Sequence, residues 1–372
     1  MSTFPTMPSD FGLCICNLFT HDQAVQGSPT IIFPAGQAIH LLGMQLQNPR
    51  AEAAWAPIIL KHKDNSMKTS TLLLQSVTLA TALLWAPPAA RAEDAPKKVL
   101  FFSKSSGFEH DMIKQKDGKP SKAEKILTEL GAKNNIQFTF TKDGSLFTPE
   151  NIAQYDAFFF YTTGDLTEAG GDKNPPMSKE GKAAFLDAIS KGKGFIGTHS
   201  ATDTFHSPGN KDHGHARHVE DGADADPYIK MIGGEFIVHG SQQRARQICV
   251  DKKFPGMSAV PDDFGPLEEW YSLKDFAPDL HVLLVQDTSG MDKSGNNKGA
   301  YDRPNYPSTW VHQFGKGRVF YTSMGHRDDV WANPVFQQVL VGGMNWALGR
   351  VDAKVKPNLK QATPQAGVLP PG

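Results

Sequence analysis

Short apolar runs alternate with amphipathic helical segments along the central part of the chain. Helices are predicted at 121–130 and 178–191. Buried strands are predicted around them, at 98–103, 137–141, 157–161 and 194–198. Strands and helices that alternate at this spacing are typical of right-handed crossovers. We therefore expect an α/β fold in which a doubly wound, mostly parallel sheet forms a single domain.

Local signals set the ends of these helices and extend the pattern. Ser121 and Glu124 form a capping box, and Gly131 and Gly192 are predicted to end the two helices. Further elements are a short helix at 227–232, strands at 281–286, 309–313 and 317–323, and a closing helix at 336–348. The last segment, 351–372, is rich in Pro, Gln and Lys, and we expect it to be a disordered tail.

A second kind of pattern precedes the first strand. Residues 67–92 have a basic start at Lys68, an uncharged apolar middle and a small-x-small end at Ala90-Arg91-Ala92, as in a signal peptide. Pro87-Pro88 closes the apolar run short of the roughly 20 residues that a membrane span needs. We therefore predict export, to the periplasm or as a secreted protein, with no stable membrane span.

The leader defines the limits of the folded part. An export signal must stand first, so we interpret residues 1–66 as a misassigned upstream extension, disordered, and expect the domain at 93–350. Two of the three cysteines lie before the predicted cleavage site, and the third, Cys249, has no partner for an internal disulfide. Cys249 lies in a strand-like run and is interpreted as a small buried apolar residue.

Charge and motifs exclude several function classes. The 38 basic and 39 acidic residues nearly balance, which gives no electrostatic case for nucleic acid as a partner. Neither Gly-x-Gly-x-x-Gly nor a Gly-Lys-Ser/Thr ending occurs, so no nucleotide cofactor is expected. The oligomeric state is left open.

Histidines follow the predicted strands rather than lying on helix faces. In doubly wound sheets the loops after the strands form the binding site. The polar residues expected to converge there are His110, His199, Asp203, His239, Glu269, Tyr271 and His326.

Several imidazoles beside a carboxylate suit two kinds of chemistry. One imidazole can take a proton while another donates one, since imidazole titrates near neutral pH. Alternatively, a divalent metal is possible as a cofactor, with His199, His239, Glu269 and His326 as the candidate ligands. No His-Glu-x-x-His spacing supports the metal, and each histidine could instead simply bond a backbone carbonyl.

Two further features have alternative readings. His206, His213, His215 and His218 crowd a Gly-rich and Asp-rich segment that fits a solvated loop better than a metal site. Trp270, Tyr271, Trp310 and Trp331 fall near the predicted loops, where flat aromatic faces suit sugar rings, although core packing explains Trp310 equally well. His281 and His312 lie inside predicted strands and are interpreted as structural.

Several spaced motifs carry a family resemblance. They are GFEHD at 107–111, GFIGTHSATDTF at 194–205, IGGEFIVH at 232–239, EEWY at 268–271 and GKGRVFYTSMGH at 315–326. Together with NWALG at 345–349, they resemble the ThuA-like, or trehalose utilisation, family. The resemblance implies a class I glutamine amidotransferase-like fold, which is flavodoxin-like. It also implies that the seven residues named above form the site.

The resemblance also shapes the functional hypothesis. The elbow that carries a cysteine in true amidotransferases has His199 here, so Cys-dependent amidotransfer is not expected. We expect a small carbohydrate as substrate, a glycoside or its 3-keto derivative, processed by His/carboxylate acid-base catalysis. A sugar oxidoreductase is a possible functional partner. The alternatives are a metal-dependent hydrolase and a non-catalytic carbohydrate-binding module.

Overall fold

The computed structural model describes residues 95–208, 215–294 and 299–372. Both the predicted extension at 1–66 and the predicted signal peptide at 67–92 lie outside them. The strands are β1 (Lys97–Phe102), β2 (Ile136–Thr141), β3 (Ala157–Phe160), β4 (Gly194–Thr198), β5 (Glu235–His239), β6 (Gln243–Arg244), β7 (Gln247–Cys249), β8 (Leu267–Glu268), β9 (Tyr271–Lys274), β10 (His281–Gln286), β11 (Tyr306–Phe314) and β12 (Gly317–Thr322). The α-helices are α2 (Lys122–Lys133), α3 (Pro149–Ile152), α4 (Lys179–Ser190), α5 (Pro227–Ile232), α6 (Asp328–Trp331), α7 (Pro334–Ala347) and α8 (Leu359–Ala362).

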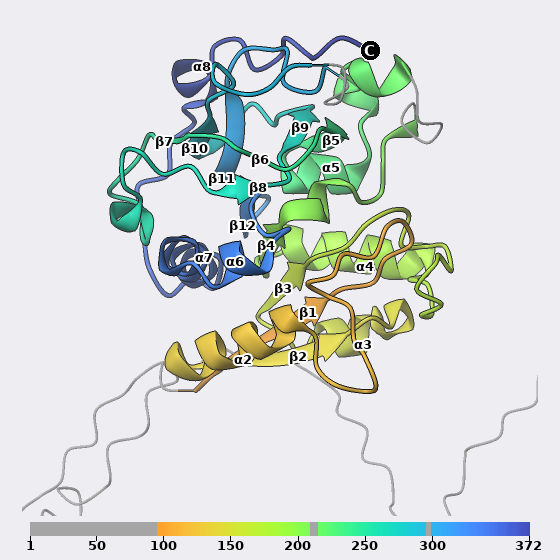
Figure 1. Ribbon diagram of the computed structural model, residues 1–372. Coiled ribbons are helices and arrows are strands. Elements are labelled where there is room, and N and C mark those ends of the chain that lie inside the picture. The colour runs from red at the N-terminus through yellow and green to blue at the C-terminus, as the bar shows by residue number, and fades with distance from the viewer. Residues whose placement is uncertain (1–94, 209–214, 295–298) are drawn as a thin grey trace, which may run out of the picture. The chain divides into compact units, whose positions relative to one another are not determined.

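Eight strands form one central sheet in the order β2-β1-β3-β4-β12-β11-β10-β7 (Figure 1). The first five strands of this order are parallel, as predicted. The last three continue the sheet in antiparallel pairing from β12 outward. The α/β fold with one mixed, doubly wound sheet is confirmed. Two short antiparallel pairs, β5 with β9 and β6 with β8, stand apart from it.

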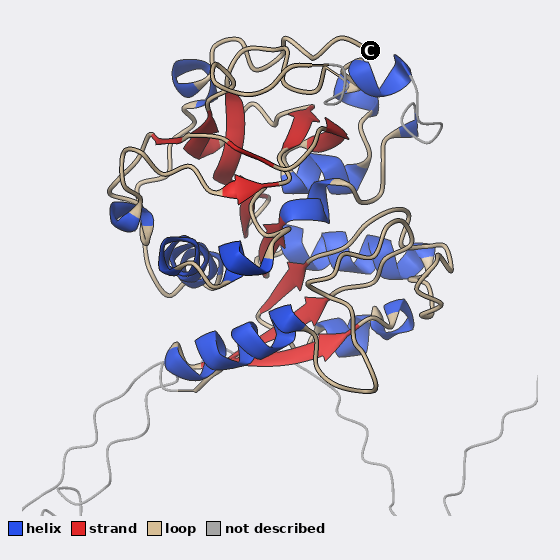
Figure 2. Cartoon of the chain, viewed as in Figure 1, coloured by secondary structure: helices blue, strands red, loops and turns tan. Residues whose placement is uncertain are grey.

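Helices cover both faces of the sheet (Figure 2), and an apolar core lies on each face. On one face, side chains of α2 and α7 pack with Phe101 and Phe159 of the sheet. On the other, α4 and α5 pack with Phe102, Phe158 and Phe160. Successive phenylalanines therefore point to opposite faces, which explains why these strands are apolar throughout rather than alternating.

Helix ends follow the predicted chemistry with one exception. In α2, the Ser121 amide donates to Glu124 Oε2 at 2.6 Å and the Glu124 amide donates to Ser121 Oγ at 3.3 Å, which completes the capping box. The prediction that Gly131 stops this helix is wrong, because α2 continues to Lys133. Gly131 instead permits close packing, since a methyl group there would press on the Ile136 carbonyl and the Phe138 ring.

The C-terminal segment is ordered, so the predicted disorder at 351–372 is wrong. Asn358 binds the backbone of Val282, with its Oδ1 accepting from the amide at 2.6 Å and its Nδ2 donating to the carbonyl at 3.1 Å. The buried Arg303 guanidinium donates to the Ala366 carbonyl at 2.6 Å. The polar composition of the segment concealed these anchors, because each uses backbone groups that composition does not record.

Among the described residues, no helix is long and apolar enough to cross a membrane.

The contact between α7 and β12 gives a test of the packing. A methyl group on Gly343 would overlap the Phe320 ring, whereas one on Gly290 meets no atom within 4 Å. We expect Gly343→Ala to lower the free energy of unfolding by roughly 1–3 kcal/mol, measured by urea denaturation, despite the better helix propensity of alanine. Gly290→Ala should stay within about 0.5 kcal/mol of the unmodified chain. Equal effects would contradict this packing.

Candidate functional site

Three histidines meet where parallel strands end. β4 and β12 pair in parallel with Thr198 opposite Thr322, so the segments that follow them leave the sheet side by side. His199 directly follows β4, His326 follows β12, and His110 belongs to the loop after β1. The His199 ring centroid lies 4.8 Å from that of His110 and 5.0 Å from that of His326. The prediction that strand-end histidines converge is confirmed for these three.

His199 occupies a strained elbow. Its φ of 44° lies in the left-handed region that non-glycine residues seldom adopt. The side chain is fully buried, and its Nδ1 lies 3.2 Å from the Ser323 carbonyl. A carbonyl can only accept, so Nδ1 carries the proton and Nε2 presents a lone pair to the other histidines.

One carboxylate joins the imidazoles. Glu269 lies in the turn between β8 and β9, and histidine nitrogens lie close to both of its carboxylate oxygens. The atom pairs are His326 Nδ1–Glu269 Oε2 at 3.1 Å, His199 Nε2–Glu269 Oε2 at 3.5 Å, His110 Nε2–Glu269 Oε2 at 4.0 Å and His239 Nδ1–Glu269 Oε1 at 3.5 Å. We call His110, His199, Glu269 and His326 the His/Glu cluster.

A chain of hydrogen bonds orients His326. Gln242 Oε1 accepts from Arg327 Nη1 at 2.6 Å, so its amide nitrogen faces His326 Nε2 at 2.9 Å and donates to it. The proton of a neutral His326 must then reside on Nδ1, which faces Glu269 and lies 3.2 Å from His199 Nε2. A donor nitrogen and an acceptor nitrogen therefore stand next to each other.

The cluster separates the pKa values of its imidazoles. Burial lowers the pKa of His110 well below its usual value, and nearby His199 and His326 lower it further. Burial also lowers the pKa of His199. For His326 burial acts in the same direction, but the hydrogen bond to Glu269 outweighs it and raises the pKa. For Glu269, burial would raise the pKa, but the imidazoles of His199 and His326 beside the carboxylate outweigh burial and hold the pKa well below its usual range.

A second glutamate holds the backbone of the site. Glu268 is fully buried, and its Oε2 accepts from the amides of Gly325 at 2.8 Å and His326 at 3.2 Å, while Oε1 accepts from the Glu269 amide at 2.9 Å. Burial raises its pKa to about 7. No role was predicted for this residue, although it lies in the EEWY motif at 268–271. Its hydrogen bonds connect the turn that carries Glu269 to the loop that carries His326.

The geometry changes the candidate metal set. The ligand atoms of His110, His199, Glu269 and His326 lie within 4.8 Å of one another. Ligands about 2.1 Å from one divalent ion lie about 3 to 4 Å apart, so this group could hold an ion after a small shift. His110 thus replaces the predicted His239, which contacts the other oxygen of Glu269.

Two predicted residues lie beside the cluster rather than in it. The Tyr271 ring packs on His199, with ring centroids 4.4 Å apart. Asp203 Oδ1 instead lies 2.7 Å from His206 Nε2, whose Nδ1 lies 3.0 Å from Glu235 Oε1. His206 was interpreted as part of a solvated loop, which is wrong, because two carboxylates hold it in a mostly buried position. These carboxylates outweigh burial and raise the pKa of His206 to about 9.

A cavity of about 440 Å³ opens beside the cluster. Its aromatic lining is Phe108 and Phe236, while Asp203 and His206 contribute polar groups. The tryptophans considered as sugar platforms do not line it: Trp270, Trp310 and Trp331 are fully buried. Indole N–H groups explain that burial, since Trp270 Nε1 donates to the Gln243 carbonyl at 2.9 Å and Trp331 Nε1 to the Gly325 carbonyl at 2.7 Å.

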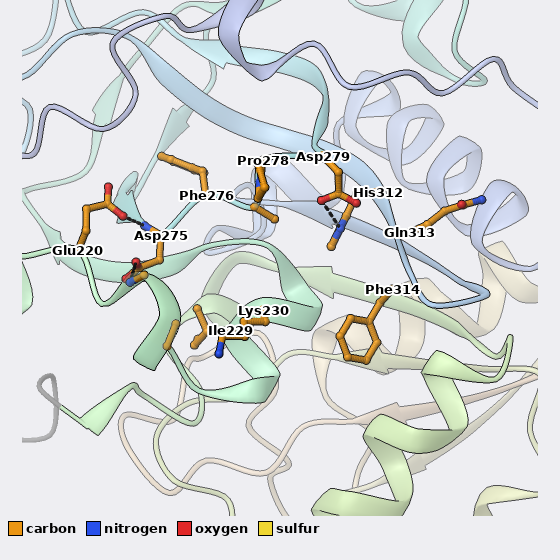
Figure 3. Close-up of a pocket in the computed structure, with 13 residues that line it drawn as sticks. Glu220, Ile229, Lys230, Asp275, Phe276, Pro278, Asp279, His312, Gln313 and Phe314 are labelled. Atoms are coloured by element: carbon orange, nitrogen blue, oxygen red, sulfur yellow. Dashed lines mark hydrogen bonds and ion pairs between the residues drawn. The ribbon is translucent and has the colours of Figure 1, made fainter.

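A different cavity, of about 400 Å³, is drawn in Figure 3. It includes His312 and Phe314, near the end of β11, and β11 runs antiparallel to β12, so this cavity lies at the opposite edge of the sheet from the cluster. His312 Nε2 lies 2.8 Å from the Met231 carbonyl, and its Nδ1 lies 3.3 Å from Asp279 Oδ1. The structural interpretation of His312 is confirmed.

The raised pKa of His206 predicts how stability varies with pH. The folded chain holds this proton more tightly than the unfolded chain, whose histidine titrates near 6.5. The stabilisation is therefore complete below pH 6.5 and is lost as pH rises through 9; it amounts to at most about 3 kcal/mol. Urea denaturation of the wild type and of His206→Gln should show a stability difference that shrinks between pH 6.5 and 10. A pH-independent difference would refute the assignment.

Comparison with known proteins identifies the fold and the family. The family model for ThuA, trehalose utilisation, matches residues 98–347. A ThuA-like protein from Bacteroides uniformis is 20% identical, with 74% of this chain and 100% of that chain covered and a TM-score of 0.51. Another from Parabacteroides merdae is 20% identical, with 70% and 93% covered and a TM-score of 0.48. No curated protein matches the chain. Because the family model spans well over half of the sequence, this chain belongs to the ThuA family, the trehalose utilisation family.

Proposed function

We propose that this chain is an exported enzyme of carbohydrate utilisation that acts on a glycoside or its 3-keto derivative through acid-base catalysis. One observation carries the proposal. The His326 Nδ1 donor lies 3.1 Å from Glu269 Oε2 and 3.2 Å from the His199 Nε2 acceptor. An acid and a base thus stand together, in a buried site at the carboxyl edge of a parallel sheet. The signal peptide predicted at 67–92 supports the exported location.

A 3-keto-glycoside suits such a pair. The ketone acidifies the hydrogen on C2, so His199 can take that proton as a base. The electrons form a C1–C2 double bond as the bond from C1 to the glycosidic oxygen breaks. His326 Nδ1 donates its proton to the departing oxygen and takes up the proton that His199 Nε2 removed from C2, so both imidazoles return to their starting protonation. Glu269 stabilises the positive charge while it lies on this pair. No electron acceptor is needed, because the step is an elimination.

Cysteine-dependent amidotransfer does not fit the site. The elbow position is occupied by His199. Cys249 is the only cysteine among the described residues; it lies on β7, the strand at the far end of the sheet from β2, and is partly buried. A thiolate nucleophile is therefore missing from the described part of the site.

A metal-dependent hydrolase is the second candidate, and the close approach of four ligand atoms favours it. In that case His199 Nε2 and His110 Nε2 would bind the ion together with Glu269, and the ion would activate a water molecule. The Ser323 carbonyl already orients His199 as it would for a metal ligand.

Replacement of His199 tests the catalytic proposal. Asparagine accepts the left-handed backbone of the elbow but cannot act as a base. We expect His199→Asn to lower kcat for 3-keto-trehalose by about 10²- to 10⁴-fold, measured by mass spectrometry of the products. His281→Gln is the control, because His281 lies on β10 and bonds Asp251 and the Lys356 carbonyl, outside the cluster.

The outcomes separate enzyme from binding module. If the wild type and His199→Asn both leave trehalose and 3-keto-trehalose unchanged while binding one of them, the catalytic proposal fails and a carbohydrate-binding module remains.

Metal analysis separates the two enzymatic candidates. Acid-base catalysis predicts that exhaustive chelation and dialysis leave turnover unchanged. The metal-dependent alternative predicts about one equivalent of a divalent ion by elemental analysis, lost in Glu269→Gln together with activity. Turnover that vanishes on chelation and returns with added metal would replace the first proposal with the second.

A further inference from the structure

The cavity beside the His/Glu cluster lies at the switch point of the sheet. In the order β2-β1-β3, successive strands are added on opposite sides of β1, and the helices that follow β1 and β3, α2 and α4, pack on opposite faces of the sheet. The cavity is lined from the loops after β1 and β3, by Phe108 in the first and by Asp165 and Glu168 in the second. Crevices at such points hold small ligands, and about 440 Å³ is within the size range of small-molecule sites.

Its two aromatic side chains link the cavity to the cluster. The Phe108 ring meets His110 edge-on, with centroids 5.0 Å apart. The Phe236 and Tyr271 ring centroids lie 4.2 Å apart, and the Tyr271 and His199 ring centroids lie 4.4 Å apart. The cavity therefore adjoins the cluster through these side chains, with the Phe108 ring in contact both with the cavity and with His110.

Phe108 is unusual in its exposure. It is 67% exposed, and it is the one mostly exposed aromatic side chain in the described part of the chain. An exposed ring of this kind can contact an apolar ligand surface, such as the C–H face of a sugar.

The polar lining defines the ligand further. Asp165, Glu168 and Asp203 contribute three carboxylates, against the cationic Arg217 and His206. Carboxylates accept hydrogen bonds from hydroxyl groups, and the His206 imidazolium holds Asp203 in place at 2.7 Å. This excess of negative charge opposes phosphate, sulfate or carboxylate on the ligand.

We propose that this cavity is a binding subsite for one neutral pyranose ring of a glycoside, with Phe108 against its C–H surface and Asp203 bonded to its hydroxyls. The inference rests on the proposed function in one respect, because that function places the reaction of the same glycoside at the His/Glu cluster. Ring recognition itself is independent of any turnover.

Titration calorimetry with trehalose and 3-keto-trehalose tests the subsite. Phe108→Ala should raise Kd by about three- to tenfold, and Phe108→Trp should restore it. Val250→Ala is the matched control, since Val250 is also an exposed apolar residue but follows β7, outside the cavity lining. Thermal melting should show all three variants folded, because both positions are exposed.

Charge discrimination is the second arm. Trehalose 6-phosphate should bind at least about tenfold more weakly than trehalose. The proposal is overturned if neither neutral sugar binds, if Phe108→Ala binds like the wild type, or if the phosphate ester binds more tightly than trehalose.

The result also distinguishes subsite from function. Phe108-dependent binding without turnover would keep the subsite and refute the proposed function. Turnover of 3-keto-trehalose with a KM indifferent to Phe108→Ala would keep the function and refute the subsite.

Discussion

The parallel pairing of β4 with β12 is the constraint on which the site depends. These strands are far apart in sequence, yet Thr198 and Thr322 face each other in register. Parallel strands end at the same edge, so His199 and the segment that carries His326 are delivered to one place. A slip of register would exchange the two faces of β12 and would separate the donor and acceptor nitrogens that now lie 3.2 Å apart.

Around that pairing, the protein accepts unfavourable local features. His199 has a left-handed φ, and Glu268 is a buried acid that accepts hydrogen bonds from backbone amides. Strain and burial of this kind persist only where surrounding contacts over-determine them. Here three backbone amides bind Glu268, and the Ser323 carbonyl fixes the ring of His199. The backbone strain and the buried acid both lie at the cluster, as is common at functional sites.

Much of the fold could be predicted from sequence, because continuous apolar runs such as Phe158-Phe159-Phe160 identify buried parallel strands and the capping box locates α2. Histidines after strands indicated the site for a topological reason. The environments of single side chains were harder. His206 looked like a loop residue because Glu235, its partner, is 29 positions away. The sequence did not indicate that Phe108 is exposed, because the exposure of an aromatic residue depends on the tertiary packing around it. Trp270 and Trp331 misled because indole suits both a sugar surface and a core with a carbonyl acceptor.

The anchored C-terminal segment limits how far the chain can be shortened. Arg303 binds Ala366 with one nitrogen, and with another it binds Ser272 and the Leu273 carbonyl, next to the tyrosine that packs on His199. The segment after residue 347 therefore braces the wall behind the elbow, although the family match ends there. A version of the protein trimmed to that match would lose the hydrogen bond between Arg303 and Ala366.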